Sequence, residues 1–258
     1  MTLAAETAGR GPPLVMLHGW GLHSGVWAGV LPLLQARFRV TRVDLPGHGA
    51  SRASTGPFDV GAIAAAVAAV APPRAAWLGW SLGGQVALAA AADCAQRIER
   101  LVLVATTPRF VTAPDWPCAM AADVLAEFAA ALATDYRKAV DSFLALQLRG
   151  DRRASELLRE LRAAVFARGE PSPAALAAGL DLLAKTDLRR DLHAVAMPAL
   201  VLSGRRDRLT PPEAGRRLAA ALPRGEYACF AAAAHAPFLT DPGAFAARVS
   251  AFLEEAAT

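Results

Sequence analysis

Residues 75–91 join a short apolar run to a glycine-rich turn and then to an alanine-rich segment. The turn at 79–83 reads GWSLG, which fits the pattern G-x-S-x-G, and one more glycine follows it. A serine in such a turn is held in a strained conformation that projects its hydroxyl above a sheet. The glycines leave room where a side chain would clash with the neighbouring strand and helix. The stretch therefore predicts a strand, a tight turn and a helix in succession.

Short apolar runs alternate with helical segments along most of the chain. Strands are predicted over 14–19, 38–44, 75–80, 100–106 and 198–204, with a weaker one over 226–232. Helices are predicted over 26–36, 60–70, 84–92 and 212–221. Continuous apolar runs are typical of strands buried on both faces, and this alternation is typical of α/β proteins with a doubly wound, mostly parallel sheet. Ligand sites of such sheets lie at the carboxyl ends of the strands.

One long segment breaks the alternation. From residue 110 to residue 192 the apolar residues follow helical spacing, and prolines at 114, 117, 171 and 173 punctuate the segment. We interpret it as an inserted helical cap. The predicted organisation is therefore a first part of the core over 1–109, a cap over 110–192 and a second part of the core over 193–258.

The composition limits the class of protein. A chain of 258 residues that is 54% hydrophobic can build one large domain with an insertion. Its three cysteines are far apart and form no C-x-x-C pair, which favours a reducing compartment over a disulfide scaffold. We find no secretory signal and no apolar stretch long enough to span a bilayer. The net charge of +4 fits an arginine-rich coding bias better than a polyanion-binding surface. We expect a soluble, monomeric, cytoplasmic protein with no nucleic-acid or membrane partner.

A serine in this type of turn requires a base and an orienting acid, in the chain order Ser, Asp or Glu, His. His235 follows the last strand-like run, where the base of Ser81 is expected, and Asp207 follows the strand predicted over 198–204. Its carboxylate would accept a hydrogen bond from the second ring nitrogen of His235 and so fix the tautomer. Asp241 is the rival acid, but it lies after the histidine and looks like the cap of the last helix.

Acyl transfer also requires two N–H donors for the oxyanion. Leu82, the residue after the serine, is predicted to supply one, and Trp20 in the loop HGWG is predicted to supply the other through its main chain. The loop DLPGHGAS at 44–51 holds an Asp and a His, but both come too early for the triad, so a turn is predicted there. The sequence has no H-E-x-x-H, no carboxylate cluster and no G-x-G-x-x-G opening a first helix. We expect neither a metal nor a cofactor.

The motifs LHGW, DLPGHGAS, GWSLGG, SGRRDRLTP and AAAAHAPF, in this order, resemble those of the α/β-hydrolase family across nearly the whole chain. HGWG with GWSLGG, FLALQ at 143–147 and AHAPF are similar to a narrower family, the methyl ester esterases that act on pimeloyl-acyl-carrier protein in biotin synthesis. This resemblance implies hydrolysis of the ester to the acid and methanol. It implies Ser81 as the nucleophile, His235 as the base and Asp207 as the orienting acid.

The resemblance also implies binding residues. Substrate contacts are expected from Trp20, Ser81, Leu82, Phe143, Leu144, Ala145, Leu146, Gln147 and His235. Members of the family hold the acidic carrier protein with basic residues of the cap, and the candidates here are Arg137, Lys138, Arg152, Arg159 and Arg162. The last three recur at helical spacing, which predicts either one basic docking face or an ordinary solvated helix surface. Trp80, Trp116 and Phe143 either line an acyl tunnel or belong to the core.

Two other functions remain open at this point. The first is a different hydrolase on the same fold, such as an enol-lactone hydrolase, a carbon–carbon bond hydrolase or a broad short-chain esterase, because these enzymes share the triad. The second is a catalytically silent ligand receptor. The competent side chains at all three triad positions argue against this function. A panel of substrates separates the hydrolases from one another, and a fluorophosphonate that labels Ser81 separates an enzyme from a receptor.

Overall fold

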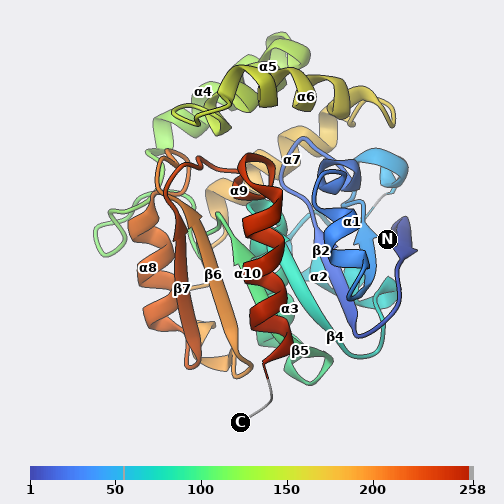
Figure 1. Ribbon diagram of the computed structural model, residues 1–258. Coiled ribbons are helices and arrows are strands. Elements are labelled where there is room, and N and C mark those ends of the chain that lie inside the picture. Colours follow the sequence, from blue (N-terminus) through green and yellow to red (C-terminus); the bar gives the residue numbers. More distant parts are fainter. Residues whose placement is uncertain (55, 256–258) are drawn as a thin grey trace.

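The computed structural model describes residues 1–54 and 56–255, and its centre is a seven-stranded sheet with helices on its faces (Figure 1). The strands are β1 (Ala5–Ala8), β2 (Pro13–Leu17), β3 (Arg39–Val43), β4 (Ala75–Trp80), β5 (Ile98–Val104), β6 (Ala199–Gly204) and β7 (Gly225–Phe230). Their order across the sheet is β1-β3-β2-β4-β5-β6-β7. Among the described strands only β1 runs antiparallel to its neighbour, β3.

Helices connect the strands. The α-helices are α1 (Leu31–Gln35), α2 (Val60–Val70), α3 (Leu82–Asp93), α4 (Ala122–Thr134), α5 (Tyr136–Gln147), α6 (Ala154–Phe166), α7 (Pro173–Lys185), α8 (Pro212–Ala221), α9 (Pro237–Thr240) and α10 (Pro242–Glu254). The 3-10 helices are η1 (Ser24–Trp27), η2 (Gly49–Ser51), η3 (Ala95–Arg97) and η4 (Leu192–Ala194). In Figure 1, α1 and α10 lie in front of the sheet and α2 and α3 lie behind it.

The predicted α/β class with a doubly wound, mostly parallel sheet is confirmed. All residues of β4 and of β6 are buried, because helices cover both faces of the sheet at these strands. The predicted bounds of α2 and α8 match the structure. Asp241 is the N-cap of α10, as predicted, and its side chain accepts a hydrogen bond of 2.9 Å from the Ala244 N–H.

Two predicted elements differ from the structure. The helix predicted over 26–36 is wrong: η1 ends at Trp27, and α1 is a helix of only five residues that starts beside Pro32. Proline has no N–H to donate and glycine disfavours the helix, so Gly29 and Pro32 interrupt the pattern. β1 was not predicted because its four residues are mostly exposed at the sheet edge and carry no apolar pattern.

Four helices, α4 to α7, occupy the chain between β5 and β6, the segment for which helical spacing was predicted. Figure 1 shows α4, α5 and α6 crossing the upper end of the sheet, with α7 beneath them. Caps formed by short polar side chains start two of these helices: the Asp135 carboxylate accepts from the Lys138 N–H, and Ser172 accepts from the Ala175 N–H. The segment is tied to the β2–η1 loop, where the Trp20 indole donates to the Leu176 carbonyl at 2.9 Å.

Among the helices that the structure describes, none combines the length and the apolar character needed to cross a membrane.

Candidate active site

Ser81 lies between the end of β4 and the start of α3, with φ 56° and ψ −118°. A positive φ is strained for a residue with a Cβ atom, so the surrounding structure must hold it. The Ser81 N–H donates to the Val104 carbonyl at 2.9 Å, and the Thr106 hydroxyl donates to the Ser81 carbonyl at 2.8 Å. Val104 is the last residue of β5 and Thr106 follows it closely, so the end of the neighbouring strand and the residues after it fix the strained turn on both sides of the serine.

The glycines of the turn are required for space, as the sequence predicted. A Cβ atom on Gly83 would lie 2.5 Å from the His18 carbonyl oxygen and 2.6 Å from that of Leu17. A Cβ atom on Gly79 would overlap the Gly83 carbonyl oxygen. These obstacles are backbone atoms that cannot rotate away, so α3 can pack this closely against β2 and β4 only with glycine at both positions.

Asp207 and His235 come together at the carboxyl ends of β6 and β7. The distance from His235 Nδ1 to Asp207 Oδ2 is 2.8 Å, and the side-chain exposures are 1% and 0%. Asp207 Oδ1 accepts the N–H groups of Leu209 and Thr210 at 2.9 and 3.0 Å, and Oδ2 also accepts the Thr210 hydroxyl at 2.6 Å. A carboxylate facing Nδ1 keeps the ring proton there, which leaves the Nε2 lone pair free to take a proton.

Trp80, the residue before Ser81, links the candidate nucleophile to His235, the candidate base. Its indole N–H donates to the His235 carbonyl at 2.8 Å, and the two rings lie 5.7 Å apart between centroids. His235 Nε2 is buried and has no hydrogen-bond partner among the described residues, so no bond joins it to the Ser81 hydroxyl. Catalytic hydrogen bonds of this kind are often long before substrate binds and tighten in the reactive complex.

The loop HGWG, residues 18–21, lies directly over the serine. A Cβ atom on Gly19 would meet the Ser81 Cβ at 3.3 Å. Within residues 1–54 and 56–255, no acceptor takes the backbone N–H of Trp20 or of Leu82. Leu82 is the first residue of α3, where the N–H groups of a helix point outward and favour negative charge. These two donors are therefore available to an oxyanion formed at Ser81.

Two buried histidines hold the backbone of this loop. His18 Nε2 accepts the Leu45 N–H at 2.9 Å, and His48 Nε2 accepts the Gly21 N–H at 3.2 Å. Their Nδ1 atoms face carbonyl oxygens of Gly19 and Pro46. Burial lowers the pKa of His18 to about 3, with the neighbouring His48 as a further cause, and burial lowers the pKa of His48 to about 4. Both rings are therefore neutral hydrogen-bonding groups at physiological pH.

The Asp44 side chain joins the loop at 44–51 to the start of η1. Its carboxylate accepts the N–H groups of Ser24 at 2.7 Å and of Ala50 at 2.9 Å. Burial opposes its charge, but His18 and these N–H donors more than compensate, and the pKa of Asp44 is lowered. The turn predicted over 44–51 is present and includes η2. No group of three or more His, Cys, Asp or Glu side chains arranged to hold a metal occurs among the residues that the structure describes.

The segment predicted to contact substrate is the last part of α5. Phe143, Leu144 and Gln147 are buried, whereas Ala145 is exposed and Leu146 is half-buried. Only one face of a helix can point inward, so the prediction that all five residues contact substrate does not fit Ala145. The Phe143 ring packs edge-on against Trp20 at 4.7 Å between centroids. The Gln147 Oε1 atom is buried and, among the described residues, has no hydrogen-bond partner.

Of the other two candidate wall residues, Trp80 belongs to the hydrophobic core, whereas Trp116 is buried but is not part of that core. Trp80 packs against the rings of Trp27 and Phe238 at centroid distances of 6.3 and 5.0 Å, in addition to its bond to His235. Trp116 donates from its indole to the Thr107 hydroxyl at 3.2 Å. Trp80 therefore helps to hold His235, the candidate base, in place.

The predicted docking residues do not form one helical face. Arg152 precedes α6, so the predicted helical spacing of Arg152 with Arg159 and Arg162 is wrong. Arg162 pairs with Asp141 of α5, and Arg137 pairs with Glu170. In the part of the chain that the structure describes, the exposed Lys138, Arg152 and Arg159 form no ion pair.

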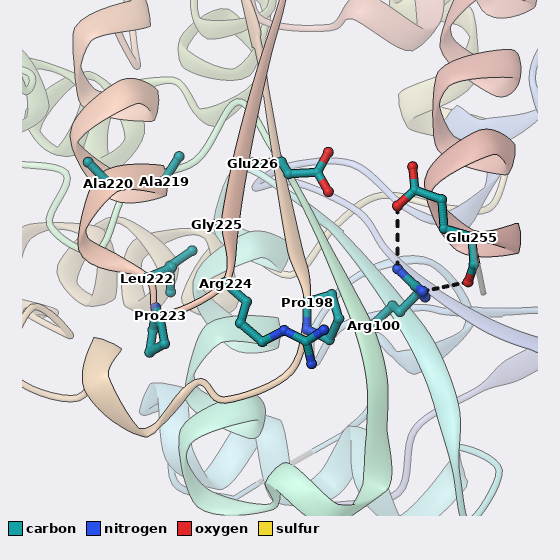
Figure 2. Close-up of a pocket in the computed structure, with 10 residues that line it drawn as sticks. All are labelled: Arg100, Pro198, Ala219, Ala220, Leu222, Pro223, Arg224, Gly225, Glu226 and Glu255. Atoms are coloured by element: carbon teal, nitrogen blue, oxygen red, sulfur yellow. Dashed lines mark hydrogen bonds and ion pairs between the residues drawn. The ribbon is translucent and has the colours of Figure 1, made fainter. Parts of the chain in front are cut away.

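A polar cavity of about 460 Å³ lies at the other end of the sheet (Figure 2). Its lining includes Pro198, Arg224 and Gly225, which stand at the amino ends of β6 and β7. Arg100 crosses its edge and donates to the Glu255 carbonyl at 2.6 Å, as Figure 2 shows. The catalytic candidates all follow carboxyl ends of strands, so this cavity is separate from them.

Thr106, Thr210 and Asp151 support the site but were not singled out in the sequence. Thr210 lies three residues after Asp207, and this spacing is the signal that could have identified it. Thr106 and Asp151 act on residues 25 and 83 positions away, respectively, so no local pattern indicates them.

Comparisons with known proteins agree with this fold. The family model described as alpha/beta hydrolase fold matches residues 12–242. The chain is 47% identical over 235 residues to a pimeloyl-[acyl-carrier protein] methyl ester esterase of Xanthomonas axonopodis pv. citri, covering 91% of this chain and 92% of the relative. It is 44% identical over 240 residues to the protein of that name from Nitrosomonas europaea, covering 93% and 95%.

Among solved structures, an enol-lactonase from Burkholderia xenovorans LB400 superimposes with a TM-score of 0.85 at 26% identity, covering 98% of this chain and 96% of that one. The strained serine turn, the parallel sheet and the extent of these matches lead to one conclusion. The chain belongs to the α/β-hydrolase family.

Proposed function

We propose that this chain is a carboxylic ester hydrolase that cleaves the methyl ester of pimeloyl-acyl-carrier protein in biotin synthesis. The observation that carries the proposal is the buried hydrogen bond between His235 Nδ1 and Asp207 Oδ2, at the same edge of the sheet as a serine held at positive φ. The substrate is supported by relatives with 43–47% identity that carry the name of this esterase and align over nearly their whole length.

In the first step, His235 Nε2 takes the proton of the Ser81 hydroxyl as the oxygen attacks the ester carbonyl. The N–H groups of Trp20 and Leu82 hold the oxyanion, and the Asp207 carboxylate stabilises the imidazolium. His235 then gives its proton to the departing methoxide, so methanol leaves and an acyl-serine remains. In the second step, the same histidine takes a proton from water as the water attacks the acyl-serine, and it then gives that proton to the departing Ser81 oxygen, which releases the acid and restores the hydroxyl.

The cap is proposed to select the substrate. In this reading, residues 110–192 form the cap between core parts 1–109 and 193–258, and the buried face of α5 borders the acyl chain. The apolar rings of Phe143 and Trp20 suit the methylene chain, and the unpartnered Gln147 Oε1 offers a polar contact. The acyl-carrier protein is the proposed partner, and the enzyme is proposed to act as a cytoplasmic monomer without a cofactor.

The decisive experiment is an assay of methanol release from pimeloyl-carrier-protein methyl ester by the purified protein and by Ser81→Ala. We expect turnover by the wild type, and less than about a tenth of that rate in the variant with an unchanged fold. Parallel assays use short-chain methyl esters, an enol lactone and a vinylogous diketone. Preference for the lactone, the substrate class in the name of the Burkholderia structure, would replace the esterase proposal. A folded protein that no fluorophosphonate labels would favour a receptor.

A further inference from the structure

The end of α5 and the turn that follows it contact the loops that carry His235 and Asp207. The Gln147 carbonyl accepts the His235 N–H at 3.0 Å. The Gly150 carbonyl accepts from the Arg206 guanidinium at 2.9 Å, and Arg206 immediately precedes Asp207. One turn of the cap segment therefore holds the backbone of the base and the neighbour of the acid, although it lies more than fifty residues earlier in the chain.

Asp151, within this turn, is a buried carboxylate with 8% exposure. Its Oδ2 accepts the Ala234 N–H at 3.2 Å and the Thr240 hydroxyl. Its Oδ1 accepts the Arg153 N–H at 2.8 Å. Ala234 is the residue before His235, and Thr240 is the last residue of α9. The carboxylate thus joins the start of α6 to both ends of the loop that carries the base.

We infer that Asp151 is a positioning residue that fixes the His235 loop for proton transfer. The inference rests on the proposed function, in which His235 is the base. Two consecutive N–H groups, those of Ala234 and His235, are held by the same turn, so the imidazole is placed by the cap segment as well as by Asp207. Because Nε2 makes no hydrogen bond to Ser81, the backbone of the loop largely sets how closely Nε2 approaches the Ser81 hydroxyl. A displacement of about 1 Å at a reacting group can cost about 100-fold in rate.

The alternative role for Asp151 is to begin α6 through its bond to the Arg153 N–H. Asp151→Asn separates the two roles. The asparagine Oδ1 can still accept the Arg153 N–H, but its NH2 group then faces the Ala234 N–H, a donor that it cannot satisfy, while the Thr240 hydroxyl must turn from donor to acceptor. A pure helix-start role leaves catalysis by this variant unchanged, whereas a positioning role does not.

The experiment measures kcat and KM of the full-length protein on a p-nitrophenyl ester, which needs no carrier. For Asp151→Asn we expect kcat to fall about 10- to 100-fold with KM within about twofold of the wild type. The matched control is Asp135→Asn, because Asp135 caps α5 in the same segment and has no contact with the catalytic loops. This control is expected to keep the wild-type kcat. The rate at which a fluorophosphonate labels Ser81 should fall in parallel with kcat.

A second variant keeps the inference testable if Asp151→Asn does not fold. Thr240→Val removes one donor to Oδ2 and leaves the carboxylate in place, so a smaller fall in kcat at constant KM is expected. If Asp151→Asn folds and keeps the wild-type kcat and labelling rate, the inference is overturned. If only Thr240→Val folds, the same result in that variant overturns it. An inactive wild type that no fluorophosphonate labels would instead overturn the proposed function, so the two failures are distinct.

Discussion

The Asp207 carboxylate and the His235 imidazole form a hydrogen bond of 2.8 Å that is closed off from solvent. The same carboxylate accepts three further hydrogen bonds, from two backbone N–H groups and the Thr210 hydroxyl. An acceptor saturated in this way cannot turn, so it fixes both the plane of the imidazole and its tautomer.

Replacing Asp207, the proposed orienting acid, should remove the tautomer of His235 that leaves Nε2 free to accept a proton. In Asp207→Asn, the amide can donate to His235 Nδ1 and move the ring proton to Nε2, so we expect kcat to fall about 10³- to 10⁴-fold. Steady-state kinetics on a p-nitrophenyl ester measure this loss. The matched control is Asp241→Asn, which alters the cap of α10 and should keep the wild-type kcat. Equal losses in the two variants would contradict the assignment of Asp207.

Adding one methyl group to the serine turn should destabilise the protein. Gly83→Ala places a Cβ atom against the carbonyl oxygens of His18 and Leu17, so the backbone must shift, and we expect a loss of roughly 1–3 kcal/mol in the free energy of unfolding. Gly243→Ala is the control, because its Cβ atom would meet only Asp241 Oδ1, at 3.7 Å. Urea unfolding of both variants checks the prediction, and a loss that is no larger at Gly83 would contradict it.

The two buried histidines should make the fold sensitive to acid. The pKa values of His18 and His48 are lowered to about 3 and about 4, so each ring stays neutral in the fold but takes up a proton on unfolding below its ordinary pKa of 6.5. Their stabilising contribution is complete above that value and declines as the pH falls toward 4, by about 1.4 kcal/mol per pH unit for each ring.

Urea titrations across this pH range check the acid prediction. In His48→Gln, which removes one titrating ring, the decline of the unfolding free energy with falling pH should be shallower by about 1.4 kcal/mol per unit. The absolute stability of this variant is expected to be lower, because the bond to the Gly21 N–H is disturbed. Identical pH slopes in the two proteins would show that His48 does not titrate in this way.

Charge reversal on the proposed cap should weaken only the reaction with the carrier-bound substrate. A triple variant that combines Lys138→Glu, Arg152→Glu and Arg159→Glu loses the electrostatic steering of the acidic carrier. We therefore expect kcat/KM for the carrier-bound substrate to fall about 10-fold or more at low salt. Hydrolysis of p-nitrophenyl esters should be unchanged. Arg74→Glu, just before β4 at the opposite end of the sheet, is the control. Equal loss on both substrates would exclude docking at these residues.

Local patterns in the sequence predicted much of this molecule. The turn at 79–83 predicted a strained serine between a strand and a helix, and the structure has Ser81 at φ 56° between β4 and α3. The apolar runs predicted the parallel strands because helices bury them on both faces. The elements that the sequence did not predict, such as β1 and the division between η1 and α1, are short and lack an extended apolar pattern.

The amino-acid sequence by itself indicated the fold class and selected Ser81, Asp207 and His235 as the candidate triad. Both inferences depend on local motifs, in which residue types recur at short spacing. The tertiary structure alone decided how these groups are held. The hydroxyl of Thr106 on the Ser81 carbonyl and the carboxylate of Asp151 beside His235 join segments remote in the chain. Which remote groups meet depends on how strands, helices and loops pack, and no local pattern encodes that packing.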